Sequence, residues 1–109
     1  MIFRAGAGIS TITGKENRMK FMVAWKIPPG CYKAAVERFL NTGAPNPTGV
    51  KTIGRWHAPG SSSGWHVVEG DTAGVAELEA VWGDLLELQI TPVIEDAEAA
   101  SSLAKVHRK

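Results

Sequence analysis

The middle of the chain carries two tryptophan–histidine pairs, which are its most reactive group of neighbouring side chains. Trp56 and His57 precede a Pro-Gly-Ser-Ser-Ser-Gly loop at residues 59–64, and Trp65 and His66 follow it. A short loop of this composition between two such arms predicts a β-hairpin. Folding the arms about the serines predicts that the two histidines lie opposite each other on antiparallel strands, with the two indoles close by.

His57 and His66 are therefore candidate catalytic residues. Imidazole titrates near neutral pH, so either side chain can act as a general base, and its nitrogen also binds Zn, Cu or Fe. A metal site needs a third ligand, but Glu69 falls on the opposite face of the strand from His66 and His107 lies near the C-terminus. We predict no metal site and no cofactor. The alternative to a pocket is that both histidines are structural and pack on tryptophan.

We expect a ligand pocket at this hairpin. Indoles beside a polar loop can form the walls of a site for an aromatic or quinone-like ligand, although packing at a dimer interface explains them equally well. An arginine on the same strand can hold a carboxylate or phosphate through two hydrogen bonds, or it can be solvated or paired with a glutamate. The predicted ligand-binding residues are Trp25, Arg55, Trp56, His57, Trp65 and His66.

Cys31 is the only cysteine in the chain. Its position at the start of a predicted helix suits a reactive thiol. The chain has no second cysteine to resolve a sulfenic acid, so we favour a passive residue. A lone cysteine excludes an intramolecular disulfide and fits a reducing compartment, which predicts a cytoplasmic location.

The composition is that of an ordinary globular domain. Hydrophobic residues make up 44% of the 109 positions and charged residues 21%, and 12 basic and 11 acidic side chains give a net charge of +1. These charges are spread along the chain without a basic cluster. Partners of strong negative charge, nucleic acid and membrane surfaces, are therefore not expected.

Prolines, glycines and the spacing of apolar residues divide the chain into strands and helices. A nearly continuous apolar run closed by Pro28-Pro29-Gly30 predicts a first strand that is buried on both faces. The predicted elements are a strand at 20–27, a helix with an apolar stripe of Tyr32, Val36, Phe39 and Leu40 that ends at Gly43, the two hairpin strands, a helix capped by Asp71 or Thr72 with a stripe of Val75, Leu78, Trp82, Leu85 and Leu86, a strand at 88–94, and a helix at 96–106.

This order matches the α+β, ferredoxin-like βαββαβ arrangement with a four-stranded antiparallel sheet, followed by a short C-terminal helix. Right-handed crossovers place strands one and three at the centre, and Pro92, which donates no backbone hydrogen bond, agrees with an edge position for the fourth strand. Two helices cover only one face of such a sheet. We predict that a second copy of the chain covers the other face in a homodimer, with the C-terminal helix sealing the rim or reaching across to the partner.

The start of the sequence differs from the rest. Residues 1–18 mix Gly, Ser, Thr and charged residues without helical or strand periodicity, and they lack the unbroken apolar segment of a secretory signal. We predict a flexible N-terminal tail at 1–18 and a single domain at 19–109. The alternative is a short accessory strand around residues 9–13.

Three stretches resemble a family of small bacterial proteins known as a domain of unknown function: MKFMVAWKIPPGCYKAAVERF, GVKTIGRWHAPGSSSGWHVVEG and LLELQITPVIEDAEAA. The resemblance runs from Met19 to about Lys105, and GRWHAPG and GWH are its most specific pieces. That family is placed with the dimeric α+β barrels, so the resemblance implies this fold and a homodimer. It implies no activity, because the wider superfamily includes cofactor-free monooxygenases, haem-handling proteins, isomerases and plain ligand binders.

Two classes of function fit these observations. In the first, a cleft between sheet and helices holds a small aromatic or polar metabolite, and the protein is a binder or a cofactor-independent enzyme in which a histidine transfers a proton. In the second, the protein is a non-catalytic dimer whose hairpin serves assembly or recognition of another protein. Ligand-dependent melting distinguishes the two classes, because a ligand that binds only the folded state raises its stability.

Overall fold

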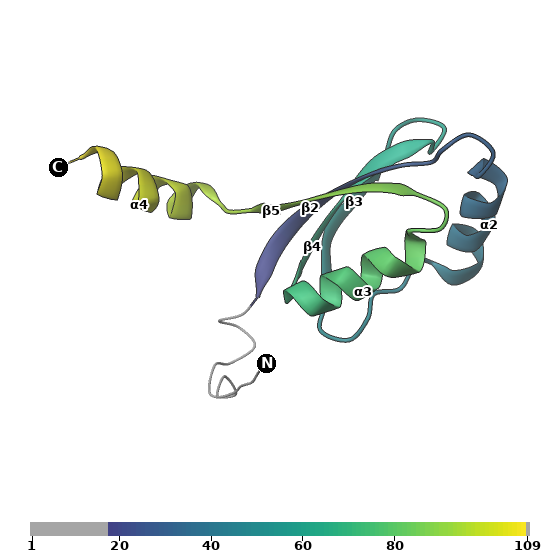
Figure 1. The fold of residues 1–109 in the computed structure, drawn as a ribbon, viewed down its shortest axis with the longest axis horizontal. Coiled ribbons are helices and arrows are strands. Elements are labelled where there is room, and N and C mark those ends of the chain that lie inside the picture. The colour runs from purple at the N-terminus through teal and green to yellow at the C-terminus, as the bar shows by residue number, and fades with distance from the viewer. Residues whose placement is uncertain (1–17, 109) are drawn as a thin grey trace.

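The computed structural model describes residues 18–108, and the order of its elements confirms the ferredoxin-like α+β fold. Two β-α-β units, each with its two strands parallel to one another, are followed by a C-terminal helix (Figure 1). The elements are β2 (Met19–Lys26), α2 (Tyr32–Thr42), β3 (Lys51–His57), β4 (Ser63–Gly70), α3 (Thr72–Trp82), β5 (Glu87–Val93) and α4 (Asp96–His107).

The four strands form one antiparallel sheet in the order β3-β4-β2-β5. The first and third strands in sequence, β2 and β4, are therefore central, as predicted. Pro92 lies on the edge strand β5 and pairs in register with Phe21 of β2. An edge position tolerates a proline because one side of the strand makes no ladder hydrogen bonds.

Both helices α2 and α3 lie on the same side of the sheet (Figure 1). The buried cluster on that side joins Phe21, Val23 and Val68 from the two central strands to Val75 and Leu78 from α3. Val50, in the loop before β3, completes this cluster. These side chains are at most 9% exposed, so they form the hydrophobic core of the chain.

The ends of the helices follow from particular residues. Gly43 ends α2 in the left-handed conformation, with φ of 71°, and its N–H donates to the carbonyl of Phe39, as the sequence predicts. Asp71 caps α3 by accepting a hydrogen bond of 2.7 Å from the N–H of Gly74. The predicted apolar stripe of this helix included Leu85 and Leu86, but α3 ends at Trp82. Glycine is a poor helix former, and the chain turns away at Gly83.

The face of the sheet that carries no helix is open in the single chain. Phe21 and Val23 of β2 are buried, but Met22, which points to the other side, is 37% exposed. The expected burial of the first strand on both faces is therefore not met within one chain. Trp56 and Trp65 lie on the same open face and are 56% and 48% exposed.

The C-terminal helix α4 extends away from the sheet and the other helices (Figure 1). It buries no residue, and its apolar side chains Leu103 and Val106 are 59% and 61% exposed. We call this helix the arm. An ion pair between Lys20 and Glu95 joins its start to β2. Among the described residues, no helix has both the length and the apolar character that crossing a membrane requires.

The predicted tail at 1–18 lies outside the described residues except for Arg18. Its guanidinium donates to the carbonyl oxygens of Gly49, at 3.3 Å, and Glu69, at 3.4 Å. These contacts join the chain just before β2 to the far end of β4. Arg18 therefore contacts the domain that we predicted to begin at Met19.

Candidate functional site

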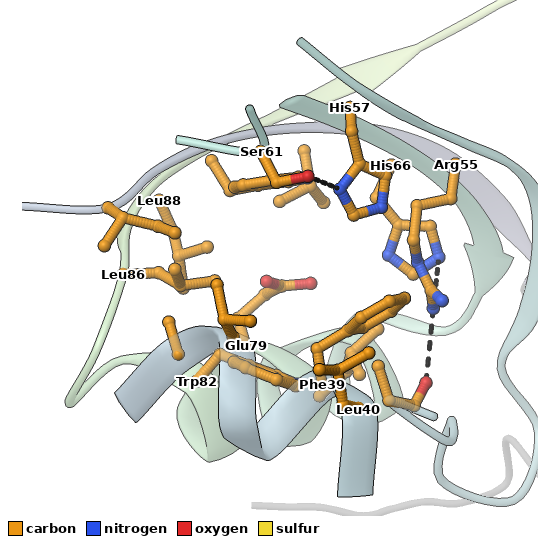
Figure 2. Close-up of a pocket in the computed structure, with 17 residues that line it drawn as sticks. Phe39, Leu40, Arg55, His57, Ser61, His66, Glu79, Trp82, Leu86 and Leu88 are labelled. Atoms are coloured by element: carbon orange, nitrogen blue, oxygen red, sulfur yellow. Dashed lines mark hydrogen bonds between the residues drawn. The ribbon is translucent and has the colours of Figure 1, made fainter. Parts of the chain in front are cut away.

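A cavity of about 220 Å³ lies between the sheet and the two helices α2 and α3 (Figure 2). Its walls are mostly apolar, with a few polar side chains on the sheet and one carboxyl on α3. It is lined by Val23, Trp25, Ile27, Ala35, Val36, Phe39, Leu40, Ala44, Arg55, His57, Ser61, His66, Leu78, Glu79, Trp82, Leu86 and Leu88. A concave apolar site with a small number of polar groups is the usual form of a small-molecule pocket.

The hairpin register differs from the prediction, so His57 does not lie opposite His66. His57 pairs with Gly64 and His66 pairs with Arg55. The reason is the position of the turn: the N–H of Ser61 donates to the carbonyl of Ala58 at 2.7 Å, which centres the turn on Pro-Gly at 59–60. Gly60 has φ of 90°, as the third residue of a type II turn requires. The shift is two residues, so both histidines stay on the helix-facing side.

The structure brings four of the predicted binding residues to the cavity and leaves two away from it. Trp25, Arg55, His57 and His66 all line it. The two remaining tryptophans, 56 and 65, pair with each other on the opposite face of the sheet. Neighbours in a strand point to opposite faces, so the residue before His57 and the residue before His66 cannot share their side. The expectation that these two indoles form walls of the cleft is therefore corrected.

His66 is held in the neutral state at the base of the cavity. It is 8% exposed, and burial together with the charge of Arg55 lowers its pKa to about 4. The side-chain amide of Asn46 donates to Thr52 Oγ1 at 2.9 Å, which leaves the Thr52 hydroxyl free to donate to His66 Nε2 at 2.8 Å. With this nitrogen already engaged, His66 serves to position Arg55 and Thr52 rather than to accept a proton from a ligand.

His57 has a different environment at the mouth of the cavity. Its Nδ1 lies 3.2 Å from the hydroxyl of Ser61, and its ring packs edge-on against Trp25 and Phe39 at centroid distances of 5.1 and 5.3 Å. The aromatic contacts fix the plane of the ring. The other ring nitrogen of His57, Nε2, makes no hydrogen bond within residues 18–108.

Arg55 supplies a cation inside the cavity. Its Nη2 donates to the carbonyl of Ala44 at 3.2 Å and lies 3.4 Å from His66 Nε2, while its guanidinium carbon is 5.8 Å from the centre of the Phe39 ring. Burial lowers its pKa, but an arginine keeps its charge at neutral pH. Figure 2 shows Arg55, His57 and His66 together at one end of the cavity and Leu86 and Leu88 at the other.

Glu79 is the functional residue that the sequence analysis missed. It is 8% exposed on α3, its carboxyl points into the cavity (Figure 2), and its Oε2 has no hydrogen-bond partner within residues 18–108. Burial raises its pKa to about 7. The signal was present in the sequence, because Glu79 is four residues after Val75 and three before Trp82, within the apolar stripe of the helix.

Neither a reactive cysteine nor a group of metal ligands adds to the chemistry of this cavity. Cys31 occupies the N-cap of α2, is partly buried and does not line the cavity. Between residues 18 and 108, no group of three His, Cys, Asp or Glu side chains lies close enough to hold a metal ion. The chemistry that the cavity can offer therefore rests on Arg55, His57 and Glu79.

Comparison with known proteins adds a family and no activity. Residues 19–107 match the family described as a domain of unknown function (DUF3303). The match covers more than half of the chain, and the chain belongs to this family. No curated protein and no solved structure matches the chain.

Proposed function

We propose that this protein binds a small molecule with an apolar, ring-sized body and one anionic or hydrogen-bond-accepting group, in the cavity between the sheet and helices α2 and α3. The observation that carries this proposal is the division of the cavity into a polar end, with Arg55, His57 and His66, and an apolar end, with Leu86 and Leu88. An amphiphilic ligand satisfies both ends at once.

The volume limits the size of the ligand. An engineered apolar cavity of about 150 Å³ holds benzene, so a cavity of about 220 Å³ suits a ring with one short substituent. Trp25, Phe39 and Trp82 supply aromatic walls for such a ring. Larger cofactors such as nucleotides exceed this space.

The charge of the polar end favours an anionic or strongly accepting head group. Arg55 is the only arginine or lysine among the lining residues, and burial keeps His66 neutral. An arginine held in place by Ala44 and Phe39 loses little further freedom when it binds a carboxylate. A hydrogen bond to such a charged group contributes about 1.5–3 kcal/mol, which is roughly a 10- to 100-fold gain in affinity.

Benzoate and benzyl alcohol test this proposal as a pair, because they share a ring and differ in charge. We expect benzoate to raise the melting temperature of the protein more than benzyl alcohol does, and Arg55→Gln to weaken benzoate roughly 10- to 100-fold but benzyl alcohol much less, because its neutral hydroxyl makes a weaker hydrogen bond. Calorimetric titration and melting curves measure both effects. Equal binding of the two compounds, or no binding of any aromatic carboxylate, would contradict the proposal.

Two tryptophan variants provide matched controls for the location of the site. Trp25→Phe removes part of the cavity wall, whereas Trp56→Phe removes the same indole area from the open face of the sheet. We expect only Trp25→Phe to change benzoate affinity. The reverse result would place the ligand on the open face.

The proposal includes a homodimer in which a second copy covers the open face of the sheet. Met22, Trp56 and Trp65 leave apolar surface uncovered there, and the arm α4 carries uncovered apolar side chains at Leu103 and Val106. Two unpartnered apolar surfaces on one chain suit an exchange of arms or a face-to-face contact between two copies. A reducing compartment such as the cytoplasm is also part of the proposal, because Cys31 is the only cysteine.

Light scattering at low micromolar concentration tests the dimer. We expect the mass of two chains for the natural sequence and of one chain for Trp65→Lys, which places a charge on the open face. Ala34→Lys, on an exposed position of α2, is the control and should remain a dimer. A folded monomer for the natural sequence would contradict this part of the proposal. A dimer that responds to no aromatic ligand would favour the second candidate, a non-catalytic assembly protein.

A further inference from the structure

Glu79 is the least expected side chain in the cavity. Carboxylates are rarely buried without a partner, because removal from water strongly disfavours the charged form. Yet Glu79 is 92% buried, since only 8% of it is exposed, and its Oε2 makes no hydrogen bond within residues 18–108. Figure 2 shows the carboxyl directed into the cavity from the helix side.

The cation in the same cavity does not neutralise this carboxyl. Arg55 and Glu79 both line the cavity, but no ion pair or hydrogen bond joins them in the part of the chain that the structure describes. Arg55 instead donates to the carbonyl of Ala44, in the loop after α2, and lies beside His66. A cation and an unpaired carboxyl thus lie on opposite walls of a space that holds a small ring.

This arrangement provides the two groups that enolisation of a carbonyl compound requires. A hydrogen-bond donor must stabilise the oxygen on which negative charge develops, and a base must lie near the carbon that loses its proton. We propose that Glu79 is the proton-transferring catalytic residue of a cofactor-independent isomerisation of an aromatic carbonyl compound held at Arg55. This inference rests on the proposed function, since it assumes that the ligand lies in this cavity.

The step requires no oxidant or reductant. A Glu79 carboxylate oxygen takes a proton from the carbon next to the carbonyl, the C–H electron pair becomes the C=C bond of an enolate, and the carbonyl π pair moves to the oxygen. Arg55 donates a hydrogen bond to this oxygen. Glu79 then returns the proton to the oxygen or to a carbon of the enolate, which gives the isomer and restores the carboxylate.

The environment of Glu79 suits both halves of this cycle. A base that gives back the proton it takes is most effective when its pKa lies near the working pH, and burial raises the pKa of Glu79 to about 7. The other titratable groups that line the cavity, Arg55, His57 and His66, are all on the sheet side. His66 is neutral with its Nε2 engaged, so it does not compete for the proton.

Phenylpyruvate is a suitable probe because it combines a ring, a carboxylate and exchangeable hydrogens next to a carbonyl. Deuterium uptake at its methylene group in D₂O, followed by NMR, reports removal of the proton without any assumption about the natural product. We expect the full-length protein to accelerate this exchange at least 100-fold over buffer, with a rate that rises with pH as Glu79 ionises.

Glu79→Gln keeps the size and removes the base. We expect its exchange rate to fall at least 100-fold, close to that of buffer, while phenylpyruvate affinity by calorimetric titration stays within about threefold. Glu77→Gln makes the same change on an exposed position of the same helix and should leave exchange unaltered. Glu79→Asp, which withdraws the carboxyl by one methylene group, should retain a small part of the rate.

The outcomes separate this inference from the proposed function. Binding of phenylpyruvate without exchange above buffer overturns the role of Glu79 and leaves the binding proposal standing. Exchange that survives in Glu79→Gln also overturns it. Failure of phenylpyruvate and of benzoate to bind overturns both proposals.

Discussion

The pH dependence of folding provides a direct test of the buried carboxyl and the buried imidazole. Glu79 has a pKa of about 7 in the folded chain against an ordinary value of 4.5. Because the folded state holds this proton more tightly than the unfolded state, Glu79 favours folding most below pH 4.5, and that stability is lost as the pH rises to 7. His66 behaves in the opposite way: its pKa of about 4 against 6.5 means that stability is lost as the pH falls from 6.5 to 4.

The two effects have similar size. A pKa difference of about 2.5 corresponds to at most about 3.4 kcal/mol. Both side chains border a cavity, where water screens their charges, and we therefore expect about 1–2 kcal/mol for each. Between pH 4.5 and 6.5 the two slopes oppose each other, so their joint contribution to the stability of the natural protein should change little.

Single substitutions should reveal how each of the two groups changes the free energy of unfolding with pH. Relative to the natural protein, we expect Glu79→Gln to be stabilising by about 1–2 kcal/mol at pH 8 and neutral at pH 4.5. His66→Gln should be destabilising at pH 8 because it alters the contacts with Thr52, and this difference from the natural protein should shrink as the pH falls below 6.5. Urea unfolding followed by tryptophan fluorescence, at one fixed protein concentration from pH 4 to 8, measures both differences.

Comparing each variant with the natural protein removes the contributions of all other titrating groups, provided that they lie far from the changed residue. A Glu79→Gln difference that is the same at pH 4.5 and pH 8 would show that the carboxyl is solvated in the folded state. The inference about proton transfer would then lose its structural basis. A His66→Gln difference independent of pH would likewise show that this imidazole is not buried in its neutral form.

Two further predictions concern packing. Gly64→Ala should lower stability by about 1–3 kcal/mol in thermal and urea unfolding, because an added Cβ would clash with the Trp25 ring and the Trp56 carbonyl oxygen; a neutral effect would mean that the Trp25 indole does not lie over this glycine. Asp71→Ala should cost about 1 kcal/mol by the same measurements, because Gly74 N–H loses its acceptor, and Asp71→Asn should restore most of it.

The fold was predictable from local features of the sequence. Pro28-Pro29-Gly30 ends the first strand, Gly43 and Asp71 mark the end and the start of the two helices, and Pro92 places the last strand at an edge. Each of these residues restricts the backbone by its own covalent structure or hydrogen bonding. Their effect depends little on distant contacts, and the ferredoxin-like order of elements follows from them.

The site was only partly predictable, for two different reasons. The face of each hairpin residue follows from strand alternation, and applying that rule strictly separates Trp56 from His57. The register depends on the turn, and the Pro-Gly signal for a type II turn competed with the symmetry of the three serines. The cavity itself could not be predicted, because it depends on how far α2 and α3 stand from the sheet, which the spacing of apolar residues does not specify.

The helix-facing side of the sheet divides into a packed half and a hollow half, and the division follows from side-chain size. At one end Phe21 and Val68 meet Val75 of α3 and fill the space. At the other end His66 and Gly64 occupy the corresponding positions of β4, and the Trp25 ring lies over the glycine.

The polar side chains of the hollow half make it less stable than an apolar core. Burial opposes ionisation of both His66 and Glu79, and Glu79 has no partner within residues 18–108. Leucine or methionine, which are of similar size, would remove both costs at these positions. A bound molecule that accepts from Arg55 and meets Glu79 offsets them without filling the cavity permanently. The same residues that lower the stability of the empty protein are therefore those that we expect to bind its ligand.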